Sequence, residues 1–299
     1  MDDEAPVSHE AAPFEEVDPQ ALLPGWDPLS PAEASSLLAV GQGRLDVWMG
    51  ERESGKTTLN TQLYERQRRV GEHARFAGSR TLLAFERLAH PCRAASGRAV
   101  AQTHRTEVDP DGREILHLAL ALDEEHVHLL LADLPGEIFR QLADNQLTAA
   151  DVPLLRRADK LALLIDGARL SDRRTRSSAI TRVRQLLERL RAEALPHPRT
   201  ELALVVTKWD LVQDDEDAVS YWGPREEELI AEVRSVDSAA LHLHVAAAAP
   251  GGFPRDDGVA ALRAWLLAPP RGQVDPPLAP HVWPRDAPPC LRRPWRRAA

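Results

Sequence analysis

Eight consecutive residues, Gly50-Glu51-Arg52-Glu53-Ser54-Gly55-Lys56-Thr57, match the spacing G-x-x-x-x-G-K-[ST]. Glycines at these two positions let backbone N–H groups surround phosphate oxygens, and a helix beginning near Lys56 would add its positive end. The Lys56 ammonium, to which we also assign a catalytic role, would reach the β- and γ-phosphates, and the Thr57 hydroxyl would bind Mg²⁺. We therefore predict a phosphate-binding loop, or P-loop, whose contacting residues are Gly50, Glu53, Ser54, Gly55, Lys56, Thr57 and Thr58.

A second motif, Asp133-Leu134-Pro135-Gly136-Glu137, follows an apolar run at residues 127–132. A carboxylate at the end of a strand beside a P-loop can bind Mg²⁺ through water, and the N–H of Gly136 can reach a γ-phosphate. Asp-x-Pro-Gly after a strand is also typical of a simple turn. Its position after a buried strand, downstream of the P-loop, favours Asp133 as a metal-binding residue and Gly136 as a nucleotide-binding one.

The third motif is Thr207-Lys208-Trp209-Asp210, which follows the apolar run at residues 202–206. Lys208 is one of only three lysines in the chain, beside Lys56 and Lys160. Asp210 could accept two hydrogen bonds from N1–H and the N2 amine of guanine, whereas adenine lacks these donors and would leave a buried Asp unpaired. Taken alone, Asp210 is equally consistent with a cap after a strand. In chain order with the other two motifs, it indicates guanine specificity.

Apolar patterns predict the elements that position these motifs. Alternation at Leu45, Val47 and Met49 predicts a strand before the P-loop, and continuous runs predict buried strands at residues 161–165, 202–206 and 241–246. Residues 116–122 and 127–132 are typical of an antiparallel hairpin. Helices are predicted for about twenty residues from Lys56, after a cap near Ser79, and at residues 180–190, 224–233 and 259–267. We expect an α/β fold with a mostly parallel sheet, one antiparallel hairpin and helices on both faces.

The three motifs in this order resemble the translation-factor-related (TRAFAC) class of P-loop GTPases with Ras-like topology, over residues 37–267. More narrowly, residues 79–85 (SRTLLAF) and Arg105-Thr106 resemble the bacterial double-GTPase family. The resemblance implies bound GTP or GDP with Mg²⁺, and hydrolysis of GTP to GDP and phosphate as a molecular switch. It also implies a protein partner that responds to the switch, in a bacterial conflict or signalling system. Ala247, in the Ala246-Ala247-Ala248 segment, falls where such proteins contact the guanine O6 through a backbone N–H.

The chain also departs from the family pattern. The stretch between Lys56 and Asp133 is long, which implies an insertion in the first switch at about residues 70–108. The switch threonine that binds Mg²⁺ and assists catalysis is Thr103 or Thr106, and we favour Thr106 because it is nearer the hairpin. Glu137 stands where Ras-like enzymes place a glutamine that orients water, so we expect slow intrinsic hydrolysis, completed by an arginine from a partner or by Arg140. An arginine at position 140 is more typical of a solvated helix face.

Two other functions remain open from the residues. An ATP-using P-loop protein would require Asp210 to be only a cap. An interaction module that binds GTP without hydrolysing it is compatible with a carboxylate at Glu137. Preference between GTP and ATP tests the first alternative, and a turnover assay tests the second.

The composition limits location and partners. Nine acidic residues and no lysine or arginine occur in residues 1–36, which we expect to form a disordered leader, and residues 268–299 form a Pro/Arg-rich tail. Those nine acids equal the whole net charge of −9, so the remainder of the chain is close to neutral. A neutral remainder argues against nucleic-acid binding. Cys92 and Cys290 are too few for a disulfide framework, and no apolar run suits a signal peptide or a transmembrane segment, so we expect a cytoplasmic protein.

Overall fold

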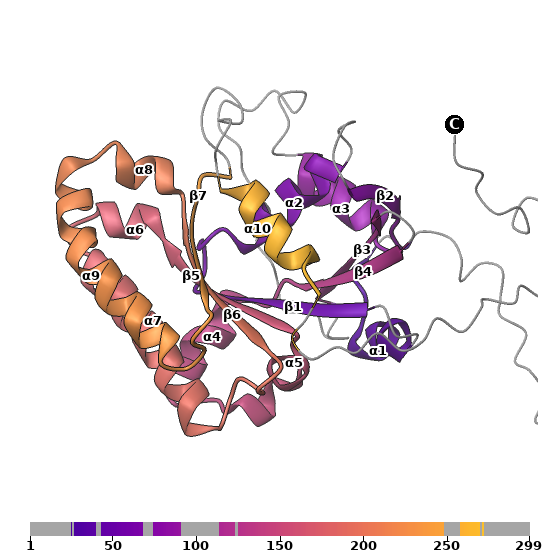
Figure 1. The fold of residues 1–299 in the computed structure, drawn as a ribbon, viewed down its shortest axis with the longest axis horizontal. Coiled ribbons are helices and arrows are strands. Elements are labelled where there is room, and N and C mark those ends of the chain that lie inside the picture. The colour runs from indigo at the N-terminus through magenta and orange to yellow at the C-terminus, as the bar shows by residue number, and fades with distance from the viewer. Residues whose placement is uncertain are drawn as a thin grey trace, which may run out of the picture.

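A computed structural model of the protein describes residues 25, 27–39, 43–67, 74–90, 114–122, 125–247, 258–269 and 271. Within these residues, seven strands form one sheet in the order β2-β3-β4-β1-β5-β6-β7 (Figure 1). Strands β4, β1, β5, β6 and β7 run parallel, whereas β3 is antiparallel to both β4 and β2. The strand bounds are β1 Gly43–Met49, β2 Ala74–Gly78, β3 Ile115–Leu122, β4 Glu125–Ala132, β5 Lys160–Asp166, β6 Glu201–Thr207 and β7 Leu241–Val245. The predicted α/β class, with a mostly parallel sheet and an early hairpin, is confirmed.

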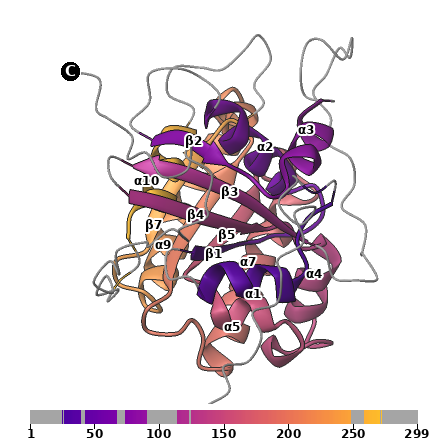
Figure 2. The same cartoon turned by 90° about the vertical axis from the view of Figure 1, so that its right-hand side faces the viewer.

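Helices cover both faces of this sheet, and each face has its own apolar core (Figures 1 and 2). One core packs α1, α4, α5, α6, α7, α8 and α9 against the sheet, and the other packs α2, α3 and α10. The helix bounds on the first face are α1 Pro31–Ala39, α4 Gly136–Ala143, α5 Pro153–Arg157, α6 Gly167–Ser171, α7 Arg176–Ala192, α8 Trp209–Gln213 and α9 Glu216–Arg234, with the 3-10 helix η4 at Ala149–Asp151. Those on the second face are α2 Lys56–Gln67, α3 Leu82–Ala89 and α10 Val259–Leu267.

The double covering explains why the central strands are apolar at consecutive positions. In β5, Leu161 and Leu163 face the first core, whereas Ala162 and Leu164 face the second. The same holds for β1, which the alternation of Leu45, Val47 and Met49 predicts as a strand. Trp48 between them is also fully buried, on the opposite face.

Strand β2 is absent from the sequence-based prediction, and the helix predicted for twenty residues from Lys56 is wrong at its end. Helix α2 ends at Gln67, and the chain is a strand again from Ala74. β2 is an edge strand whose Phe76 is 39% exposed, so it has no apolar alternation to reveal it. Its pairing with β3, rather than its own composition, places it in the sheet.

The predicted leader also contains ordered structure at its end. The backbone of Leu29 exchanges hydrogen bonds of 2.7 and 3.2 Å with Ile115, and α1 begins at Pro31. Ser30 and Glu33 form a capping box, in which the Ser30 N–H donates to the Glu33 carboxylate at 2.8 Å and the Glu33 N–H donates to the Ser30 hydroxyl at 3.3 Å. A Ser-Pro-x-Glu sequence is a helix start that the prediction missed.

Two other predicted helix starts need correction. Thr81, rather than Ser79, immediately precedes α3, and the Ser79 hydroxyl instead donates to the His117 carbonyl at 2.6 Å. Helix α9 begins at Glu216, eight residues before the predicted start at Pro224. Its cap is Asp215, which accepts the N–H groups of Asp217 and Ala218, so the proline lies inside the helix. No helix among the described residues is long and apolar enough to cross a membrane.

At the edge of the sheet opposite the P-loop, two cations hold the end of α10. The Lys160 ammonium, which is fully buried, donates to the carbonyls of Trp265 and Ala268, and Arg44 donates to Ala268 at 3.0 Å. Positive charge at a helix C-terminus is stabilising. Lys160 therefore has a structural role, although lysines are rare in this chain.

Candidate nucleotide-binding site

The three sequence motifs meet because each follows the carboxyl end of a parallel strand. The P-loop follows β1, Asp133 follows β4, and Thr207 ends β6. Carboxyl ends of parallel strands lie at one edge of a sheet, which is where α/β proteins bind ligands. All predicted site residues are described except Thr106 and its alternative Thr103, which lie outside the described residues.

The P-loop connects β1 to α2 and is folded back tightly on itself. Glu53 and Gly55 have left-handed backbones, with φ of 66° and 92°. A Cβ on Gly50 would lie 2.4 Å from the Ser54 hydroxyl oxygen and 3.0 Å from the Leu164 Cβ, so a side chain at the first glycine would displace its neighbours. Left-handed residues within such a turn produce the backbone concavities that bind anions. Thr58 is half-buried in the first turn of α2.

Lys56 is buried inside this loop, with 6% of its surface exposed. Its ammonium donates to the carbonyls of Gly50 at 2.8 Å and Glu51 at 2.9 Å. Burial lowers the pKa of Lys56 to about 8, although the negative charges of Asp133 and Glu137 act in the opposite direction. A phosphate bound here would stabilise the charged form further.

Thr57 and Asp133, the two described residues predicted to bind Mg²⁺, lie in contact. The Thr57 hydroxyl donates to the Asp133 carboxylate at 2.8 Å, and both side chains are buried. A hydroxyl and a carboxylate are hard oxygen ligands of the kind that Mg²⁺ prefers. The donor set fits this ion beside the phosphates.

Gly136 begins α4 directly against the P-loop. A Cβ at this position would lie 2.1 Å from the Arg52 backbone nitrogen, so a side chain would push the two segments apart. Glu137 is in the first turn of the same helix, half-buried, and its charge favours the protonated form of Lys56. The second motif therefore lies where it would meet the terminal phosphate.

Thr207 connects the third motif to the P-loop. Its hydroxyl lies 2.9 Å from the Ser54 carbonyl and 3.1 Å from the Ile165 carbonyl, and it is buried. Lys208 has a left-handed backbone with φ of 50° and pairs with Asp166 at 2.9 Å. Asp210 lies half-buried in the first turn of α8, and Ala247 lies buried just after β7.

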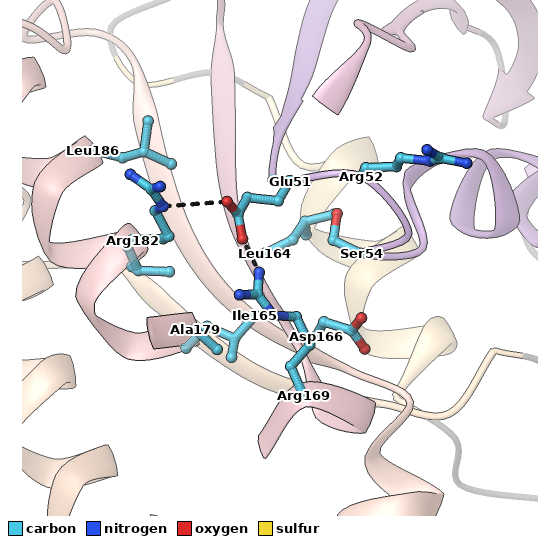
Figure 3. A pocket seen from close by; sticks show the side chains of 12 residues that line it. Glu51, Arg52, Ser54, Leu164, Ile165, Asp166, Arg169, Ala179, Arg182 and Leu186 are labelled. Atoms are coloured by element: carbon cyan, nitrogen blue, oxygen red, sulfur yellow. Dashed lines mark ion pairs between the residues drawn. The ribbon is translucent and has the colours of Figure 1, made fainter. Parts of the chain in front are cut away.

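The structure adds polar partners that the sequence reasoning missed. Glu51 of the P-loop contacts Arg169 of α6 and lies 3.2 Å from Arg182 of α7, in a hollow between these helices and the loop (Figure 3). No sequence spacing connects these three residues. Asp166, in contrast, could have been found, because it ends a buried strand, and Asp133 directly follows one.

A P-loop, an Asp-x-x-Gly motif and a Thr-Lys-x-Asp motif at one edge of such a sheet define a P-loop protein of the GTPase type. The Double-GTPase 2 family model matches residues 48–266, and the chain belongs to this family. The resemblance inferred from residues 79–85 and 105–106 is thereby confirmed. A search of curated proteins gives no match.

Replacing Thr207 tests the contact between the Thr207-Lys208-Trp209-Asp210 motif and the P-loop. Thr207→Val should cost about 1–3 kcal/mol of stability because it leaves buried carbonyls without a donor. Loss of this contact should also weaken GTP binding about tenfold, the equivalent of ~1.4 kcal/mol. Urea unfolding and nucleotide titration measure the two effects.

Thr200→Val is the matched control. Thr200 is buried at the other end of β6, where its hydroxyl donates to the Ala158 carbonyl at 2.7 Å. It should lose similar stability and keep its GTP affinity. Equal affinity losses in the two variants would contradict a specific role for Thr207.

The lowered pKa of Lys56 predicts how binding depends on pH. A triphosphate stabilises the ammonium and raises its pKa, so binding takes up a proton wherever the lysine is neutral in the protein alone. GTP affinity should be constant below pH about 8, the pKa of Lys56, and should fall by up to about tenfold per unit above it. Titrations between about pH 7 and 9 test this, with Lys56→Arg as a control that stays charged throughout. A wild-type affinity that is independent of pH would refute the assignment.

Proposed function

We propose that the protein binds GTP with Mg²⁺ and hydrolyses it to GDP and phosphate as a molecular switch. The observation that carries this proposal is the convergence of Lys56, the Thr57–Asp133 pair and the Thr207–Asp210 motif at one edge of the sheet. Family membership supports a guanine nucleotide. Asp210 would select it by accepting the N1–H and N2 hydrogen bonds of guanine, which adenine cannot donate.

The reaction is phosphoryl transfer to water. A water oxygen forms a bond to the γ-phosphorus, the bond to the oxygen bridging the β- and γ-phosphates breaks with GDP as the leaving group, and the proton that the water loses passes to the released phosphate. Lys56 stabilises the charge that develops on these oxygens, and the N–H of Gly136 orients the γ-phosphate. Mg²⁺, held by Thr57 and by Asp133 through water, would supply further positive charge. The first-switch insertion at about residues 70–108 would contribute Thr106 to the same ion.

Glu137 sets our expectation for the rate. A carboxylate repels the negative γ-phosphate, so it is a poor group for positioning the attacking water. We expect slow intrinsic turnover, accelerated by an arginine from a partner protein or by the exposed Arg140 of α4. The switch would then act with that partner in a bacterial conflict or signalling system. We place it in the cytoplasm, because two cysteines far apart in the sequence do not suggest a disulfide framework. The alternative function, a GTP-binding module without turnover, rests on the same Glu137.

Nucleotide preference tests the guanine assignment. Wild-type protein with Mg²⁺ should bind a fluorescent GTP analogue much more tightly than the ATP analogue, and Asp210→Asn should remove the preference. The expected loss for GTP is at least about tenfold, because an amide cannot accept both hydrogen bonds. Asp214→Asn, at an exposed position one turn further along, is the matched control and should bind as wild type. If ATP binds as well as GTP, Asp210 is only a cap and the P-loop serves another nucleotide.

Turnover tests the role of Glu137. Glu137→Gln should raise the rate of phosphate release by about tenfold, which corresponds to ~1.4 kcal/mol of barrier. The amide removes the repulsion and can still orient water. Glu188→Gln, an exposed glutamate of α7, should leave the rate unchanged. A lower rate in Glu137→Gln would instead identify Glu137 as a base, and no release from any variant would favour the binding module.

A further inference from the structure

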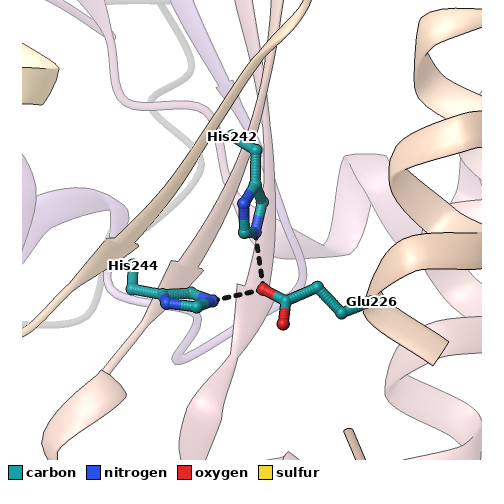
Figure 4. Close-up of side chains that lie close together, drawn as sticks. All are labelled: Glu226, His242 and His244. Atoms are coloured by element: carbon teal, nitrogen blue, oxygen red, sulfur yellow. Dashed lines mark hydrogen bonds and ion pairs between the residues drawn. The ribbon is translucent and has the colours of Figure 1, made fainter. Parts of the chain in front are cut away.

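A second cluster of ligating side chains lies on β7 and α9, apart from the P-loop. His242 and His244 are two residues apart on β7 and therefore point to the same face of the strand. Their Nε2 atoms lie 3.0 and 2.5 Å from one carboxylate oxygen of Glu226, which α9 presents from the facing layer (Figure 4). Two imidazoles and a carboxylate from separate elements thus converge on one point.

The geometry of this cluster is close to that of a metal centre. The three ligand atoms lie within 4.8 Å of one another. Metal–ligand bonds of about 2.0–2.2 Å in a tetrahedral site place neighbouring ligand atoms about 3.4 Å apart, so the separations between these ligand atoms need to change by at most about 1.4 Å. All three side chains are partly exposed, at 18–28%, which leaves room for water as a further ligand.

The surroundings hold the ligands in place. The Trp209 ring stacks on His244 with centroids 3.5 Å apart and an angle of 7° between the planes. On the backbone side, a Cβ on Gly258 would lie 1.9 Å from the His244 carbonyl oxygen, so the start of α10 packs directly against this strand. A ligand whose orientation is fixed by neighbours needs less ordering when a metal binds.

We propose that Glu226, His242 and His244 bind one divalent transition-metal ion of the Zn²⁺ type. Two imidazole nitrogens with one carboxylate oxygen suit Zn²⁺, Co²⁺ or Ni²⁺ and do not suit Mg²⁺, which prefers oxygen ligands. The site is therefore distinct from the Mg²⁺ site at Thr57 and Asp133. The bound ion joins the edge strand β7 to α9, and Trp209, which precedes Asp210 in α8, contacts one of its ligands.

The test is a titration of the untagged full-length protein with Zn²⁺ alone, in competition with a chelating dye. We expect one tight equivalent per chain and a higher melting temperature with the metal. His242→Gln and Glu226→Gln should each weaken binding by about tenfold or more, since even indirect supports of metal ligands have effects of this size. His126→Gln, at an exposed histidine of β4, is the control and should bind as wild type.

A wild type that lacks the tight equivalent would overturn the proposal, as would unchanged affinity in both ligand variants, which would place the ion elsewhere. If a variant loses its fold by circular dichroism, the Co²⁺ spectrum of the wild type decides. Intense visible bands of a four- or five-coordinate ion support the site, and the weak spectrum of hydrated Co²⁺ refutes it. Zn²⁺ should also change the tryptophan fluorescence of the wild type, because Trp209 stacks on His244. Trp209→Phe, which keeps the other six of the seven tryptophans, should show no such change.

Discussion

Parallel pairing in the middle of the sheet fixes where every candidate nucleotide-binding residue lies. β1 lies between β4 and β5, and β5 pairs with β6 so that Asp166 is next to Thr207. The P-loop and the Thr207–Asp210 motif are therefore separated by the width of one strand. The Thr207 hydroxyl reaches across the end of β5 to the Ser54 carbonyl. This contact adds a direct link between the groups that would hold the phosphates and the base, at a spacing that the strand pairing already fixes.

Charge in the P-loop is arranged so that a positive group faces inward. An acidic residue in an anion-binding loop would oppose phosphate binding. Glu51, however, is directed into the α6–α7 hollow, where Arg169 and Arg182 neutralise it. Burial, together with the charge of Arg182, lowers the pKa of Arg169. Glu53 is exposed and pairs weakly with Arg52 at 3.6 Å. Lys56 remains as the buried cation of the loop.

The fold and the motifs could be predicted because their signals are local. Continuous apolar runs identify strands buried on both faces, and the P-loop spacing fixes a strand before it and a helix after it. β2 could not be found this way, because an exposed edge strand such as Ala74–Gly78 is defined by its partner. The histidines show the same limit. On the hairpin, His117 is buried and its Nδ1 accepts the Arg80 N–H at 2.9 Å, a contact that no local pattern in the sequence indicates. His242 and His244 form a candidate metal site only together with Glu226, which lies on α9 and which no sequence spacing connects to them.

Helix α4 is attached to the P-loop at both of its ends. Gly136, at its start, lies against the Arg52 backbone, and Asp144, at its end, contacts Arg182, which in turn pairs with Glu51. The two attachment points are about 12 Å apart along the helix axis. A displacement of α4 therefore changes the packing of Gly136 on the Arg52 backbone, the Asp144–Arg182 pair, or both. The direction in which this helix can move is consequently restricted before any ligand or partner acts on it.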